Sequence, residues 1–118
     1  MSYDISFKAK LEGMDRYIPV RYCVANITWN VREIIVKSTG LEWKNEANNG
    51  PCAEVIPKIE AGIMELVEHG EKYKQYEAPN GWGTVKGTIN FFSKILAAWN
   101  DLVQEDEELA MAATFWIE

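Results

Sequence analysis

The 118-residue chain has few of the residues that build metal centres and nucleophilic sites, with only two cysteines and one histidine. A structural zinc site needs four nitrogen or sulfur ligands at short spacings, and Cys23, Cys52 and His69 do not supply them. A Cys52–His69 pair would have to be assembled in space. Glu65, Glu68 and His69 share a helical neighbourhood and could contact a divalent ion, but acidic helix faces are ordinarily just hydrated. We therefore expect no metal ion, no cofactor and no catalytic residue. These expectations favour a protein that is not an enzyme.

Long hydrophobic runs are also absent. No stretch approaches the roughly 20 apolar residues that a membrane span needs, and the opening residues lack the basic, apolar and small-residue regions of a secretory signal. We expect a cytoplasmic protein with free thiols and no membrane partner. The hydrophobic share of 47% and the charged share of 25% are typical of globular proteins. A chain of this length is expected to form a single domain over residues 1–118.

Basic residues are in the minority, at 12 Lys and Arg against 18 Asp and Glu, which gives a net charge of −6. A nucleic-acid-binding protein needs a clustered basic surface, so nucleic acid is not an expected partner. The negative charge is concentrated, because residues 104–118 contain five acidic side chains and no basic one. This concentration also argues against mimicry of DNA, which would need carboxylates spread along a surface.

Alternation of apolar and polar residues dominates the beginning of the chain. Residues 3–11 alternate and predict a half-buried strand, residues 12–15 supply a turn, and residues 17–25 predict a second strand that completes a β-hairpin. In the second strand we expect Ile18, Val20, Tyr22 and Val24 on one face. Pro19 cannot donate a ladder hydrogen bond, which predicts an edge strand or a bulge there.

Helical periodicity follows in three segments. It predicts helices from Asn30 to Gly40, from about Ala53 to Gly70 and from Thr84 to Val103, separated by a loop over residues 41–51 and an irregular connection that ends at Gly83. The third helix has the longest apolar stripe, formed by Val85, Ile89, Phe92, Leu96, Trp99 and Val103. Pro57 predicts that the second helix starts close to it or bends there.

The last residues predict a turn over residues 104–108 and a closing strand over residues 111–117, with a helical extension as the alternative. The resulting order of elements predicts a two-layer α+β fold. In this fold a small antiparallel sheet, made of the N-terminal hairpin and the C-terminal strand, packs against three helices.

Two groups of residues are candidates for binding. The glycine-rich loop before the third helix could present free N–H groups to a small anion or a partner carboxylate, with Asn80, Trp82 and Lys86 nearby, although it matches no nucleotide-binding motif. Trp43 and Trp116 join Trp82 as rings that would mark a contact surface if they are exposed together. The alternative is that each ring folds back over an edge of the core.

Three short segments, Ser2–Ile5, Asn26–Asn30 and Ala53–Glu60, resemble small uncharacterised proteins of phages and prophages of Firmicutes. The chain departs from them between Met14 and Ala25 and at its C-terminal end. The resemblance implies a mobile-element origin and a cytoplasmic setting in an infected or lysogenic bacterium. It carries no functional residue over to this chain.

Together these patterns lead us to expect a non-enzymatic protein-interaction module that acts on an unknown host or phage protein. The alternative is a small-ligand or anion-binding protein, with or without weak enzymatic activity, that uses the glycine-rich loop. The sequence leaves the oligomeric state open.

Overall fold

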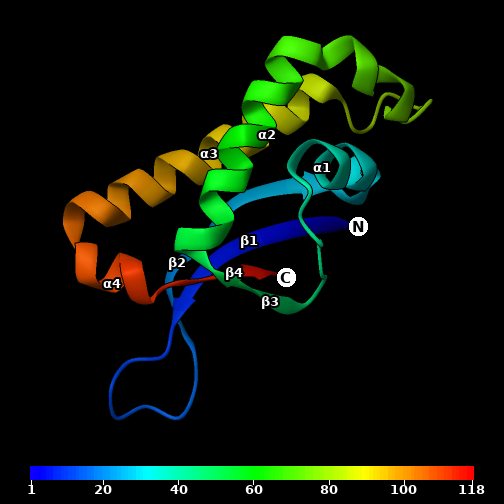
Figure 1. Ribbon diagram of the computed structural model, residues 1–118. Coiled ribbons are helices and arrows are strands. Elements are labelled where there is room, and N and C mark those ends of the chain that lie inside the picture. Colours follow the sequence, from blue (N-terminus) through cyan, green and yellow to red (C-terminus); the bar gives the residue numbers. More distant parts are fainter.

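The computed structural model describes all residues from 1 to 118 and has an α+β fold, in which helices cover one face of a four-stranded antiparallel sheet (Figure 1). The strands are β1 (Ser2–Ala9), β2 (Ile18–Thr28), β3 (Ala47–Pro51) and β4 (Thr114–Ile117). The α-helices are α1 (Arg32–Thr39), α2 (Cys52–Tyr73), α3 (Val85–Glu105) and α4 (Glu107–Ala112). Short 3₁₀ turns precede α1 at Trp29–Val31 and follow α2 at Lys74–Tyr76. The predicted fold class is confirmed.

The two ends of the chain meet at the centre of the sheet, whose strand order is β2-β1-β4-β3. Strand β1 pairs with β2 on one side and with β4 on the other. Asp4 and Glu118 exchange two backbone hydrogen bonds, at 3.0 and 2.8 Å. Figure 1 accordingly places the N and C termini on the same side of the molecule.

The edge strand β2 is bulged, as Pro19 predicts. The register between β1 and β2 shifts at two bulges, where β2 has extra residues opposite Ser6 and next to Pro19. At the first bulge Cys23 has a φ of 48°, and its N–H donates to the buried Ser6 hydroxyl at 2.9 Å. The bulge breaks the alternation expected in this strand, so that Tyr22 is 75% exposed and lies outside the core.

The helical layer consists mainly of α2 and α3, which lie side by side over the sheet (Figure 1). Its apolar residues and the inward face of the sheet form one core. The largest fully buried side chains of this core come from β1, β4, α1, α2, α3 and the loop before β3, and they are Tyr3, Ile5, Phe7, Ile34, Ile35, Trp43, Ile59, Leu66, Phe92, Ile95, Leu102 and Phe115. The helices therefore close only one face of the sheet, and Trp116 lies on the other face with Lys8.

Two elements differ from the prediction. Strand β3 forms inside the segment expected to be a loop, because backbone groups of Ala47 and Asn48 pair with β4 although their side chains do not alternate. Helix α4 occupies part of the expected turn and closing strand. Asp106 caps it by accepting the N–H of Leu109 at 3.0 Å, and the closing strand begins only at Thr114.

Helix α2 begins earlier than Pro57, at Cys52, so the proline lies inside the helix. Proline has no N–H, so the Ala53 carbonyl receives no hydrogen bond from position 57. The helix does not break there. Its irregular residue is His69, with φ −125° and ψ 31°.

Candidate functional site

The predicted anion site at the start of α3 is occupied by the chain itself. The Glu77 carboxylate accepts the N–H of Val85 at 2.8 Å, and the Thr84 hydroxyl accepts the N–H of Gly87 at 2.9 Å. These two groups use two of the N–H donors at the helix start that an external anion would need. The Glu77 carboxylate therefore lies at the helix start where the sequence predicts a bound anion.

Asn80, Trp82 and Lys86 are all exposed, but they do not form a pocket. The Asn80 side chain closes a local turn by accepting the N–H of Trp82 at 2.9 Å. Gly83, with φ 106°, packs so close to Asn30 that a Cβ atom there would lie 3.0 Å from the Asn30 Cβ. Neither Trp82 nor Lys86 lines any of five hollows found on the surface. The three residues are thus exposed on the loop and the start of α3 without enclosing a binding site.

The three candidate tryptophans lie apart from one another. Trp82 is 68% exposed, whereas Trp43 is 2% exposed and packs in the core against Tyr3 and Phe115. Trp116 is half-buried on the open face of the sheet, where the Lys8 ammonium lies 4.5 Å from its ring centre. Trp43 is therefore not exposed together with Trp82 and Trp116, and its ring adopts the alternative of folding back over the core.

The two cysteines have opposite environments. Cys23 is exposed on the bulge of β2, and Cys52 is buried at the start of α2, where its N–H donates to the Ala113 carbonyl at 2.9 Å. Cys52 and His69 stand 17 residues apart on one helix, which separates them by about 25 Å, so they form no catalytic pair.

Burial raises the pKa of the Cys52 thiol from its ordinary value of 9.0 to about 12. Because the folded state holds this proton more tightly than the unfolded state, the stability it contributes is complete below pH 9 and is lost between pH 9 and pH 12. We expect the thiol to lower the free energy of unfolding by about 1.4 kcal/mol between pH 8 and pH 10. Urea denaturation at both values should show this difference in the wild-type chain and not in Cys52→Ala. An equal loss in both chains would contradict the assignment.

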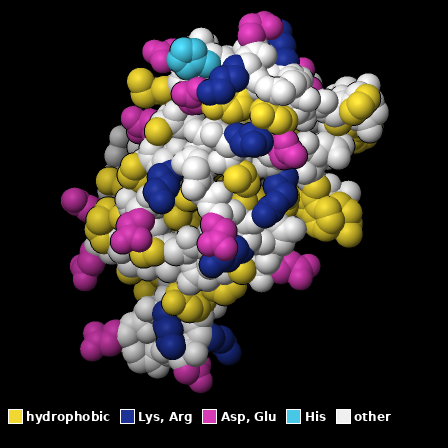
Figure 2. All heavy atoms as spheres, turned by 45° about the vertical axis from the view of Figure 1, so that its right-hand side comes forward, with side chains coloured by type: hydrophobic (Ala, Val, Ile, Leu, Met, Phe, Trp, Pro, Cys, Tyr) yellow, Lys and Arg dark blue, Asp and Glu magenta, His cyan; other side chains and the backbone are white.

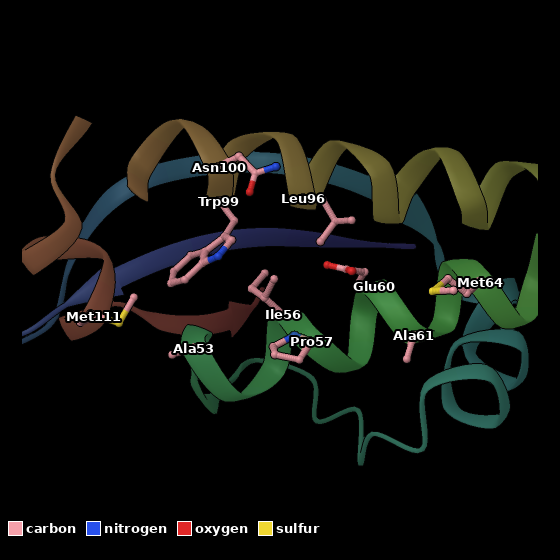
Figure 3. Close-up of a pocket in the computed structure, with 10 residues that line it drawn as sticks. All are labelled: Ala53, Ile56, Pro57, Glu60, Ala61, Met64, Leu96, Trp99, Asn100 and Met111. Carbon is pink, nitrogen blue, oxygen red and sulfur yellow. The ribbon is translucent and has the colours of Figure 1, made fainter. Parts of the chain in front are cut away.

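The strongest candidate for a functional site is a groove of about 450 Å³ between α2 and α3. One stripe of α2, part of α3 and one residue of α4 line it (Figure 3). The lining residues are mainly apolar, and they are Ala53, Ile56, Pro57, Glu60, Ala61, Met64, Leu96, Trp99, Asn100 and Met111. Met64 and Met111, at 59% and 53% exposure, lie near its two ends. The groove is an open apolar trough on the helical surface.

Polar groups in this groove have no partner within the chain. Glu60 and Asn100 form no hydrogen bond or ion pair through their side chains, and the Trp99 indole N–H donates to no acceptor. Figure 3 shows the Glu60 carboxylate pointing into the groove from α2, with Trp99 and Asn100 coming from α3. Ala53, whose carbonyl receives no hydrogen bond from Pro57, lines the same groove. The site thus offers apolar surface together with unused acceptors.

The predicted stripe of α3 did not reveal this groove. Phe92 of that stripe is buried, but Leu96 and Trp99, which were expected in the core with it, are only half-buried and line the groove. The Trp99 ring centre lies 6.3 Å from that of Phe7, so the ring also contacts the core. The available signal was the row of small and apolar residues on α2 at Ala53, Pro57, Ala61 and Met64.

Other sites gain no support. No group of three His, Cys, Asp or Glu side chains is placed to hold a metal ion, so Glu65, Glu68 and His69 do not form one. On the face seen in Figure 2, Lys and Arg side chains are interspersed with Asp and Glu and form no continuous basic patch. No helix has the combination of length and hydropathy needed to cross a bilayer. Comparisons with protein-family models, curated proteins and solved structures found no match to this chain.

Proposed function

We propose that the protein is a non-enzymatic interaction module that binds another protein through the groove between α2 and α3. The observation that carries the proposal is the exposure of apolar side chains in this groove, with Met64 and Met111 near its ends. Contiguous apolar surface is costly in water and commonly marks an interaction site. Methionine side chains are flexible and polarizable, which suits them to a contact surface.

A second copy of the chain is a poor occupant for this groove. Pairing two grooves about a two-fold axis would bring the two Glu60 carboxylates into one apolar interface. None of the ten lining residues is basic, so neither charge would have an opposite charge to pair with. The chain also has a net charge of −6, which opposes self-association. These facts favour a different protein as the partner.

The test places a photo-reactive amino acid at Ala61, in the groove, in cells that carry the gene. We expect one discrete covalent adduct, which mass spectrometry identifies. The same amino acid at the exposed Tyr22 on β2 is the matched control and should not give that adduct. Adding Met64→Asp should remove the Ala61 adduct, because it puts a charge into the apolar trough.

The proposal fails if Ala61 gives no adduct, or if both positions capture the same set of proteins. It also fails if the purified protein turns over or tightly binds a metabolite through this groove. The phage or prophage origin of the protein and of its partner stays a prediction, because only the resemblance of three short segments supports it.

A further inference from the structure

The groove also specifies the chemistry of its occupant, and this inference rests on the proposed function. We propose that the groove takes an amphipathic helix of the partner that carries a basic residue on the edge of its apolar face. Three features of the groove support this occupant: its helical walls, its length and its charge.

The walls of the groove favour a helix over an extended peptide. Both walls are α-helices, whose backbone groups are already hydrogen-bonded along most of their length. An extended peptide in this trough would leave its own N–H and C=O groups without partners next to apolar side chains. A helix satisfies these groups internally and presents side chains only. The two edge strands, which could accept an extended peptide, contribute no residue to the groove.

The length of the groove matches a short helix. On α2 the lining residues run from Ala53 to Met64, a rise of about 16 Å along the helix axis. A bound helix running beside α2 would therefore meet the groove over about three turns. Apolar anchors at positions i, i+4 and i+7 span about 10 Å and fit within this length.

The charge of the groove selects a cation. Glu60 is the only charged residue of the lining and has no ion-pair partner in the chain. The surrounding segment of residues 52–112, which supplies the whole groove, contains 11 acidic and five basic residues. Lys58 does not neutralise the groove, because it lines a different hollow next to β3. An arginine or lysine beside the anchors would pair with Glu60.

The test uses three alanine-rich helical peptides with leucines at positions i, i+4 and i+7. The peptides differ only at position i+3, which lies on the same face between the first two leucines and holds arginine, glutamine or glutamate. Titrations into the ¹⁵N-labelled full chain are followed by NMR. We expect the arginine peptide to shift the indole N–H signal of Trp99 and the amide signals of α2 and α3 around the groove, and to bind about tenfold more tightly than the glutamine peptide. The glutamate peptide should bind most weakly.

Variants of the protein assign the effect to one carboxylate. Glu60→Gln should remove the preference for the arginine peptide over the glutamine peptide. Glu54→Gln removes the same charge from an exposed position of α2 outside the groove, and it should keep the preference. The inference is overturned if no peptide binds at the groove, if the three peptides bind equally, or if Glu60→Gln keeps the preference.

The two proposals can fail separately. If Ala61 gives an adduct with a partner that is not helical or not basic at the contact, the proposed interaction function stands and the proposal of a basic helix is overturned. If the arginine peptide binds but Ala61 gives no adduct in cells, the proposed specificity of the groove stands and the proposed function is overturned. Peptide-independent dimerisation in sedimentation experiments, lost in Met64→Asp, would make a second copy the occupant and overturn both.

Discussion

Replacing Trp43 by alanine is expected to lower the free energy of unfolding by about 3–5 kcal/mol, the usual cost of emptying the space of a large buried aromatic ring. The ring is 2% exposed and has aromatic neighbours on three sides, at centroid distances of 5.7 Å to Tyr3, 5.9 Å to Phe115 and 6.2 Å to Phe91. Urea denaturation of the purified variant measures the loss. Trp82→Ala, at an exposed position, is the control and should change the stability by no more than about 0.5 kcal/mol.

Replacing Trp43 by phenylalanine distinguishes the contribution of the aromatic ring to stability from that of its N–H group. The indole nitrogen of Trp43 is buried and has no hydrogen-bond partner. A buried donor without a partner costs about 1–3 kcal/mol, which offsets part of what the ring contributes. Trp43→Phe keeps most of the aromatic contact and removes this donor, so we expect it to stay within about 1 kcal/mol of the wild type. A loss as large as that of Trp43→Ala would mean that the N–H is satisfied in the folded protein.

Replacing Gly62 by alanine is expected to lower the free energy of unfolding by about 1–3 kcal/mol, although alanine is the better helix former. Gly62 lies where α2 crosses α1 and α3. A Cβ atom there would lie 2.7 Å from Thr39 Cγ2 and 3.1 Å from Phe92 Cε2. The Thr39 side chain cannot turn away freely, because its hydroxyl donates to the Ile35 carbonyl at 2.7 Å and accepts the N–H of Leu41 at 3.1 Å.

Gly70→Ala is the matched control for this substitution on the same helix. Its nearest contact would be Val85 Cγ1 at 3.6 Å, which is ordinary van der Waals packing. We expect little change there or a slight gain from the helix propensity of alanine. Thermal denaturation of both variants measures the difference. Equal effects at the two positions would show that the close approach at Gly62 is relieved at no cost.

Most of the secondary structure could be predicted because its residues repeat with a clear period. The alternation of β1 and the apolar stripes of α2 and α3 specify element type directly. Strand β3 gives no such signal, because it is held by backbone pairing to β4 and its sequence, Ala47–Pro51, is polar. Helix α4 has six residues, too few for a helical period to stand out against the alternation that follows it.

The candidate site was less predictable, because it depends on how elements pack. The sequence marks tryptophans and a glycine-rich loop, but it does not reveal that Glu77 fills the start of α3 or that Trp43 turns inward. The groove exists because α2 and α3 meet at a rotation that leaves Leu96 and Trp99 at their seam. The packing of the helices on the sheet and the close approach of Gly62 to Phe92 are tertiary features, which a sequence period does not reveal.

The acidic segment at the end of the chain illustrates the same limit. By composition, residues 104–118 suggest a separate contact region that could be tested by truncation. In the structure Glu105 pairs with Arg21 on β2, α4 contributes Met111 to the groove, and β4 lies inside the sheet. Truncation would remove part of the fold, so point variants are the appropriate tests of this region.

The position of β4 between β1 and β3 also determines when the protein can fold during its synthesis. As the chain leaves the ribosome, β1 and β2 can form their hairpin early, since they are neighbours in sequence. Strand β3 must wait, because its only partner in the sheet is β4. The edge of β1 that pairs with β4 remains open until residues 114–117 have been made. The nascent chain therefore carries an unpaired strand edge even after the helices that cover the sheet have been synthesised.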